Sequence, residues 1–174
     1  SYSALGNVSL SIPVGNGLLS NDFDADGTTP TVTSAPSVSA QGGNVVVNAN
    51  GSFSYNPPAG FEGLDSFSYT IGDGTFSDTA TVAITVSGMI WFVDNNAAAC
   101  TSLAAGCGRL SNPLSSLAAF LALNNGSGNN PAAGDNIFLF ESATDYTGNV
   151  TLLNNQKLIG QDATAALATI AGVS

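Results

Sequence analysis

Three aspartates at alternate positions form the most chemically suggestive cluster in the sequence. Asp22, Asp24 and Asp26 precede Gly27, and residues 1–88 contain no lysine or arginine to neutralise them. Ca²⁺ takes about six to eight oxygen ligands, and such a turn can supply several, with the glycine permitting the bend. The cluster therefore predicts a calcium site, with Asp65 and Asp73 as candidates for further ligands from neighbouring strand ends.

The turn does not match the commonest calcium-binding loop, and it has an interpretation without an ion. Counted from Asp22, the position at which an EF-hand requires a bidentate glutamate holds Thr33, so the turn is not an EF-hand. Asp and Asn also favour turns because their side chains bond to nearby backbone. A solvated turn without an ion therefore remains the alternative to a calcium site.

Cys100 and Cys107 are the only cysteines, and the chain has no histidine. A structural zinc site needs about four cysteine or histidine ligands, which disfavours a metal-binding pair. The short spacing instead predicts a local disulfide between Cys100 and Cys107 rather than two free thiols. A disulfide in turn indicates an oxidising, extracellular compartment.

Carboxylates that an enzyme would need occur in the second half of the chain. They are Asp94, Asp135, Glu141, Asp145 and Asp162. Glycoside hydrolysis requires two facing carboxylates, and cleavage of acidic sugars by a lyase requires a base with a cationic partner. Arg109 and Lys157 are the only basic residues and are isolated in the sequence, and Asp135 is typical of a turn. No catalytic constellation emerges, so we expect no enzyme activity.

Aromatic residues of the same half offer a second kind of ligand site, a platform on which sugars stack. They are Trp91, Phe92, Phe138, Phe140 and Tyr146. Their positions within predicted strands favour packing in a core instead.

Composition narrows the setting of any such site. The chain has 174 residues, 44% hydrophobic and 8% charged, with a formal net charge of −10. This apolar content argues against disorder, and the negative charge excludes nucleic acid and anionic membrane surfaces as partners. No signal peptide or apolar run of transmembrane length is present, which predicts no direct membrane insertion. We expect a segment of a secreted or cell-surface protein.

Residues 1–87 show the period-two alternation of half-buried β-strands. Apolar residues alternate with polar ones at Val8, Leu10, Ile12; Phe53, Tyr55; Phe67, Tyr69, Ile71; and Ala80, Val82, Ile84, Val86. Asn50 and Gly51 predict a type I′ turn between strands at 45–47 and 53–55. Short strands without a helical pattern predict an antiparallel β-sandwich over residues 1–87.

Four ordered motifs in this part carry a resemblance to a known family. They are GLLSNDFDADG (residues 17–27), NGSFSYNP (50–57), GFEGLDSFSY (60–69) and the DG pair at 73–74. Together they resemble the cadherin-like, immunoglobulin-like tandem repeats of large bacterial surface proteins. That resemblance implies a non-catalytic stalk or adhesion unit, in many cases calcium-binding, beside neighbouring repeats or other copies of itself.

The pattern changes in residues 88–174. A continuous apolar run at 90–93 predicts a strand buried on both faces, and Asn112 with Pro113 predicts the start of an amphipathic helix extending to residue 123. Short strands follow at 137–140, 150–153, 157–159 and 168–170, too close together for intervening helices. These features resemble the N-terminal cap and first coils of a right-handed parallel β-helix of the pectin-lyase-like type. The strand, the disulfide loop and the helix within residues 90–124 correspond to the cap.

The sequence as a whole therefore predicts an all-β chain, with a sandwich at 1–87 and the capped start of a β-helix at 88–174. We expect a structural or adhesive module of a large surface protein or extracellular fibre. Its partners would be copies of itself, neighbouring repeats, glycans or surface proteins, through strand addition or end-to-end stacking. The alternative is the N-terminal part of an enzyme that binds or cleaves polysaccharide, with its catalytic coils outside this sequence.

Overall fold

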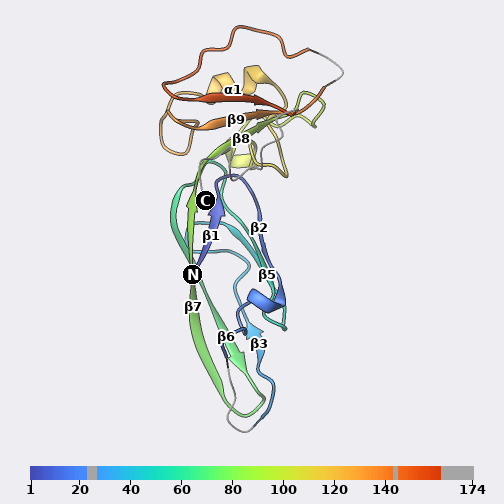
Figure 1. Ribbon diagram of the computed structural model, residues 1–174, viewed down its shortest axis with the longest axis vertical. Helices are drawn as coiled ribbons and strands as arrows, with labels where there is room; N and C mark the ends of the chain where they lie inside the picture. The colour runs from blue at the N-terminus through green and yellow to red at the C-terminus, as the bar shows by residue number, and fades with distance from the viewer. Residues whose placement is uncertain (23–26, 143–144, 162–174) are drawn as a thin grey trace. The chain divides into compact units, whose positions relative to one another are not determined.

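The computed structural model describes residues 1–22, 27–142 and 145–161 (Figure 1). The chain divides into two compact units. Unit 1 comprises residues 1–4, 9–57 and 64–85, and unit 2 comprises residues 5–8, 58–63 and 86–174. The predicted domains follow the chain with a boundary near residue 87, whereas two short segments from the first half, 5–8 and 58–63, belong to unit 2.

Two β-sheets make up most of unit 1, which is consistent with the predicted sandwich (Figure 1). The first sheet has the order β1-β7-β6-β3, from β1 (Tyr2–Leu5), β7 (Ser77–Ser87), β6 (Gly63–Gly72) and β3 (Thr31–Ser34). The second has the order β2-β5-β4, from β2 (Leu10–Ile12), β5 (Phe53–Asn56) and β4 (Asn44–Val47). A 3₁₀ turn, η1 (Val14–Asn16), follows β2. The rings of Phe53 and Phe67 meet edge to face across the two sheets, with centroids 5.5 Å apart.

Alternation along β6 and β7 separates a buried face from an exposed one. Phe67 and Ile84 face the core and are 4% and 0% exposed. On the outer face, the hydroxyl groups of Ser68 and Thr81 lie 3.0 Å apart, and those of Thr70 and Thr79 lie 3.1 Å apart. Side chains of consecutive strand residues point to opposite faces, which is why the sequence pattern located these strands.

The hairpin between β4 and β5 forms where it was predicted, but its turn is not type I′. Gly51 has φ of 83°, whereas Asn50 is absent from the residues with positive φ in the described chain. The Gly51 amide donates to the Asn48 carbonyl at 2.9 Å, and the Asn48 amide donates to the Ser52 carbonyl at 2.9 Å. This is a three-residue loop whose last residue is left-handed, which needs only one positive φ.

Unit 2 is built on a parallel three-stranded sheet with the order β10-β9-β8. Its strands are β8 (Ile90–Val93), β9 (Asn136–Leu139) and β10 (Lys157–Gly160). Ile90 and Lys157 both pair with Asn136, so the three strands are in register. One face carries Trp91, packed with Leu117 and Phe120 of the helix α1 (Leu117–Leu123). The other face carries Phe92, packed with Phe138.

The helix α1 begins later than predicted. Leu114 is held in an extended bridge beside Val93, so the chain that follows Asn112 and Pro113 is not yet helical. The helix starts after Ser116, whose hydroxyl oxygen accepts a hydrogen bond from the Ala119 amide at 3.1 Å. A serine N-cap therefore replaces the predicted Asn-Pro start. A 3₁₀ turn, η2 (Leu103–Ala105), precedes this region.

Residues 150–153 are not the strand that was predicted. The Thr151 carbonyl accepts the Asn124 side-chain amide at 3.1 Å, and the Leu153 amide donates to the Gln156 side chain at 2.8 Å. Side-chain amides therefore hold this segment in place of a strand ladder. The strands predicted at 137–140 and 157–159 are present as β9 and β10, and the one at 168–170 lies outside the described residues.

Candidate functional site

The acidic turn of unit 1 is only partly described. Asp24 and Asp26 lie outside the described residues, and Asp22 is half-buried. The Asp22 amide donates to the Leu19 carbonyl at 3.2 Å, which continues a tight turn from Gly17. The Oδ2 atom of Asp22 is inaccessible to solvent and accepts no hydrogen bond within the described part of the chain. A buried carboxylate oxygen without a donor is costly, and a hard cation would offset that cost.

Asp65, a predicted calcium ligand, lies in a dense hydrogen-bond network instead. It is 4% exposed, and its carboxylate accepts four hydrogen bonds. The donors are Ser39 Oγ at 2.5 Å, Ser66 N at 2.7 Å, Tyr55 Oη at 2.7 Å and Gln41 N at 2.9 Å. Protein donors therefore satisfy this carboxylate, and it joins β6 to β5 of the other sheet.

The network shifts the pKa values of both acidic partners. Burial by itself raises the pKa of Asp65, but the hydrogen bonds from Ser39, Tyr55, Gln41 and Ser66 outweigh it, so the pKa lies below the usual value. Burial is the main cause that raises the pKa of Tyr55, and its bond to the Asp65 carboxylate raises it further. Tyr55 is therefore a neutral donor to an ionised Asp65 at neutral pH.

Asp73, the other predicted extra ligand, stabilises a turn. Its Oδ1 accepts the amides of Thr75 and Phe76, each at 2.7 Å, between β6 and β7. Asp65 and Asp73 lie at opposite ends of the extended β6, about 26 Å apart along the strand. They cannot both bind the ion predicted at Asp22. Within residues 1–22, 27–142 and 145–161, no group of three potential metal-ligating side chains comes together.

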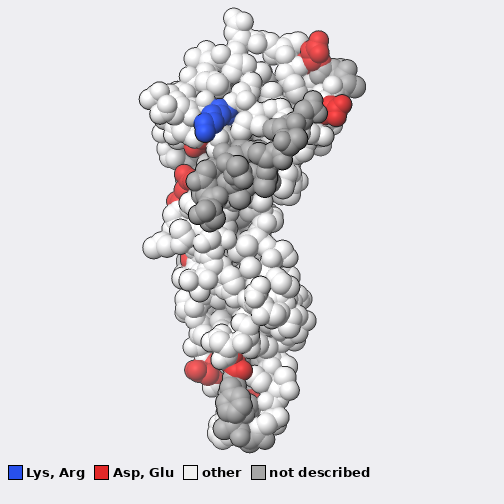
Figure 2. Space-filling view, viewed as in Figure 1, with Lys and Arg blue, Asp and Glu red and all other residues white. Residues whose placement is uncertain are grey.

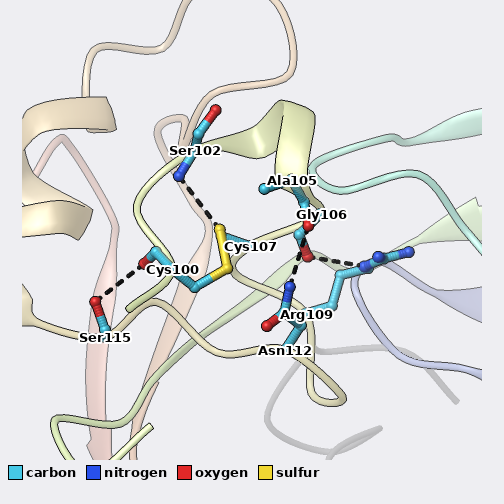
Figure 3. The surroundings of a disulfide bond; sticks show 8 residues. All are labelled: Cys100, Ser102, Ala105, Gly106, Cys107, Arg109, Asn112 and Ser115. Carbon is cyan, nitrogen blue, oxygen red and sulfur yellow. Dashed lines mark hydrogen bonds between the residues drawn. A yellow bond between two sulfur atoms is a disulfide. The ribbon is translucent and has the colours of Figure 1, made fainter. Parts of the chain in front are cut away.

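The predicted disulfide is present in unit 2 (Figure 3). Cys100 and Cys107 are bonded, and both are buried in the cluster around Trp91. The Ser102 amide donates to Cys107 Sγ at 3.2 Å, and the Ser115 hydroxyl donates to the Cys100 carbonyl at 3.2 Å. The bond therefore closes a loop that is already tied to the core.

Arg109, one of the two basic residues, serves the same loop. Its Nε donates to the Gly106 carbonyl at 2.9 Å, while the Asn112 side chain donates to the Ala105 carbonyl at 3.1 Å (Figure 3). Gly106 has φ of 74°, and a Cβ there would collide with the Arg109 guanidinium. The guanidinium therefore packs against the loop backbone.

Asp135 is buried where the sequence predicted a turn residue. Its Oδ2 accepts Trp91 Nε1 at 2.8 Å and the Ala132 amide at 2.7 Å, and the residue is 8% exposed. Burial raises the pKa of Asp135 despite these bonds. Burial also raises the pKa of Glu62, with a further contribution from the negative charge of Asp135. These two carboxyl groups are thus a like-charged pair within unit 2.

Two of the other carboxylates considered for catalysis line one hollow. Glu141 and Asp145 line an open hollow of about 280 Å³ after β9, together with Tyr146 and Gln161. The Gln161 side chain accepts the Glu141 amide at 2.8 Å. Asp94 Oδ1 accepts the Asn96 amide at 2.8 Å, and Asp162 lies outside the described residues.

The aromatic residues proposed as a sugar platform pack in the interior of unit 2. Trp91 and Phe92 are fully buried on opposite faces of β8. Phe138 and Phe140 are half-buried, with ring centroids 5.3 Å apart. Tyr146 packs against the cluster around Trp91, and its hydroxyl donates to the Phe140 carbonyl at 2.9 Å. Core packing is therefore their role in this structure.

Charged groups are sparse on the visible surface, where most residues are neither acidic nor basic (Figure 2). Basic side chains occupy one small area of that view, and acidic ones are scattered. None of the helices in the described residues is long and apolar enough to cross a membrane.

Asn7 is a structurally central residue that the sequence did not single out for a structural role. It is fully buried, although asparagine is mostly exposed in proteins, and φ is 66°. No local pattern distinguishes it from the many other asparagines. Its side chain forms hydrogen bonds with Ile90 and Gly60, which are distant in the sequence.

Residues 2–88, half of the chain, match the family described as bacterial cadherin-like domain. The chain belongs to this family. The match covers both sheets of unit 1 and the motifs that carried the predicted resemblance, so the cadherin-like part of that prediction is confirmed. Cadherin-like domains of bacteria are typically extracellular, in keeping with the disulfide. No curated protein matches the sequence of this cadherin-like chain.

Proposed function

We propose that this cadherin-like chain is a non-catalytic structural or adhesive module of a large secreted or cell-surface protein, or of an extracellular fibre. The observation that carries the proposal is the family match over residues 2–88. The hydrogen bonding of two buried carboxylates supports it. Asp65 and Asp135 both accept bonds from protein donors, which commits them to holding the fold.

The rival function, a polysaccharide-cleaving enzyme, is tested by direct assay. The protein is incubated with acidic and neutral polysaccharides, and unsaturated products and new reducing ends are measured. We expect no turnover. Turnover that disappears in Glu141→Gln or Asp145→Asn, the two carboxylates of the hollow after β9, would contradict the structural function.

Calcium is the proposed ligand of the acidic turn, held by Asp22, Asp24 and Asp26, and it stiffens the module. The buried Oδ2 of Asp22 fits this chemistry because it accepts no hydrogen bond from the residues that the structure describes. EDTA should lower the melting temperature of the wild-type protein. In Asp22→Asn the effect of EDTA should shrink, whereas in Asp73→Asn it should persist because Asp73 is committed to its turn. An identical response in all three proteins would refute this site.

Unit 2 is proposed as the start of a right-handed β-helix, with β8, the disulfide loop and α1 as its N-terminal cap and with β9 and β10 in its first coils. Paired residues of β9 and β10 lie 21 residues apart, with no helix between them in the described chain. Connections between parallel strands are right-handed in nearly all proteins. A longer segment of the gene product should gain further strands of this spacing, which amide exchange would detect as added protected segments.

Other copies of the chain and neighbouring repeats are the proposed partners, with glycans or surface proteins as adhesive ligands. Edge strands favour strand addition because their backbone groups are unpaired on one side. Sedimentation over a wide concentration range, with and without calcium, tests self-association. A strictly monomeric profile under all conditions would exclude it.

A further inference from the structure

The strand β8 lies at one edge of the parallel sheet, so one side of its backbone faces away from β9. Met89 and Val93 bond toward β9, since their carbonyls accept the amides of Asn136 at 3.1 Å and Phe140 at 3.0 Å. Ile90, Phe92 and Asp94 point their backbone groups the other way. Such an outer row of unpaired groups is a template for another strand unless something covers it.

Residues 108–114 cover most of that row. The Phe92 amide donates to the Gly108 carbonyl at 3.0 Å, and the Phe92 carbonyl accepts the Leu114 amide at 2.9 Å. The Asp94 amide donates to the Leu114 carbonyl at 2.9 Å. These bonds do not involve the carbonyl of Ile90, at the start of the row, which accepts from a different donor.

Asn7 supplies that donor. Its Nδ2 donates to the Ile90 carbonyl at 3.0 Å, while its Oδ1 accepts the Gly60 amide at 2.8 Å. Its own carbonyl accepts the Leu110 amide at 2.9 Å. One residue therefore joins the edge of β8, the segment 58–63 and the segment that covers the remainder of the row.

The local backbone is adapted to these contacts. Asn7 adopts a left-handed conformation, which asparagine tolerates better than most residues. Gly60 has φ of 72°, and a Cβ there would run into the Asn129 carbonyl and approach the Trp91 ring to 3.0 Å. The Gly60 amide thus reaches the Asn7 side chain because both residues adopt left-handed backbone conformations and because glycine has no side chain to prevent the close approach.

We propose that Asn7 is an edge cap, through which residues 5–8 and 58–63 of the cadherin-like match close the outer side of β8. The cap prevents an extended strand of a second copy from adding to the sheet at β8. This role goes beyond that of a structural module. Two segments within the family-matched sequence would protect the edge of the parallel sheet from pairing with another chain. Asn7 acts as a positioning residue, holding the covering segment 108–114 through Leu110.

The test compares variants of the full chain. Asn7→Gly removes the side-chain bonds while easing the left-handed backbone, so it leaves the fold the best chance to form. Asn155→Gly is the matched control, since Asn155 is also left-handed, with φ of 60°, but is exposed. Amide exchange and sedimentation are measured on both.

In Asn7→Gly we expect the amides of Gly60, Phe92 and Asp94 to exchange about tenfold faster, the loss of roughly one hydrogen bond. We also expect association at lower protein concentrations than in the wild-type protein, whereas Asn155→Gly should associate as the wild type does. Unchanged exchange would overturn the capping role. Faster exchange in a protein that associates no more strongly than the wild type would overturn the block to strand addition. If Asn7→Gly fails to fold, Asn7→Asp, which keeps an acceptor for Gly60 but cannot donate to Ile90, decides by the same two measurements.

Discussion

At the residue scale, Asp65 and Tyr55 join the two sheets of unit 1 through a buried hydrogen bond. Asp65 lies on β6 and Tyr55 on β5, and both residues are inaccessible or nearly so. A carboxylate that accepts several hydrogen bonds in a low-dielectric interior stabilises the fold by more than the sum of the individual bonds. Its removal leaves every surrounding donor buried without an acceptor. The network therefore stabilises the fold of unit 1, as the apolar core does, although it is built around an ionised carboxylate.

Replacing Asp65 with alanine should destabilise unit 1 by about 3 kcal/mol, because buried donors from Tyr55 and Ser39 lose their acceptor. Urea denaturation measures the change as a lower midpoint with an unchanged slope. Asp78→Ala is the control, since Asp78 is exposed and its Oδ1 accepts a hydrogen bond from the adjacent Thr79 amide. An equal loss of unfolding free energy in the two variants would show that the network around Asp65 does not stabilise unit 1.

The two units should respond to pH in opposite directions. The pKa of Asp65 is lowered on folding, so its stabilisation is present above the unfolded value near 4 and is lost as pH falls through the folded pKa. The pKa values of Asp135 and Glu62 are raised on folding. Their contribution is fully present below their unfolded values near 4 and is lost as pH rises through the folded ones.

Amide exchange, corrected for its intrinsic pH dependence, measures this difference segment by segment. Lowering the pH from neutral toward 4 should increase protection around Trp91 in unit 2, and further acidification should reduce protection around Tyr55 in unit 1. In Asp135→Asn the increase around Trp91 should be smaller, because one titrating group is gone. Parallel pH profiles for the two segments would contradict the assignment.

At the element scale, unit 2 depends on loops as much as on regular structure. The helix α1 has only seven residues, and the three strands of the sheet have four each. Elements this short are not stable alone, so covalent and hydrogen-bonded loops must hold them. The disulfide loop, the Asn124–Gln156 amide pair and the Ser116 cap serve this purpose.

Removing the disulfide with the double change Cys100→Ala and Cys107→Ala should cost unit 2 about 2–3 kcal/mol. The estimate follows from the short loop that the bond closes in the unfolded chain. Exchange of amides in β8 should accelerate, while amides in β5 of unit 1 should keep their rates. The wild-type protein under reducing conditions should behave like the double variant, and a reduced protein as stable as the oxidised one would refute the prediction.

At the scale of the whole molecule, the dominant physical property is a net charge of −10 on a chain with two basic residues. Self-repulsion of this kind opposes compact states and association between copies, and salt screens it. A surface with few charges, on which Ser, Thr and Asn provide solubility, keeps the repulsion tolerable (Figure 2).

Raising the NaCl concentration from low to physiological values should therefore raise the melting temperature by about 2–4 °C, equivalent to about 1 kcal/mol for a chain of this size. The measurement is made with a chelator present throughout, so that adventitious calcium does not contribute. A melting temperature that stays constant or falls with salt would show that the negative charge is already neutralised by other means.

The sequence by itself determined the strands with clear alternation, the hairpin at Asn50 and Gly51, the disulfide and the cadherin-like family. These features are local, because side-chain period, turn residues and cysteine spacing act over a few neighbouring positions. The start of α1 was missed because Leu114 bridges to Val93, a partner about 20 residues away. The segment 150–153 was missed because side chains of Asn124 and Gln156 displace a strand ladder there.

Only the tertiary structure decided the roles of the polar residues. Asp65 reads in the sequence as a possible metal ligand, and Asn7 reads as one asparagine among many. Their functions depend on donors brought from Tyr55 and Ser39 in one case, and on acceptors at Ile90 and donors at Gly60 in the other. A carboxylate or an amide has the same local sequence signature whether it binds an ion, water or protein. Burial and the identity of distant partners make the choice, and both exist only once the chain has folded.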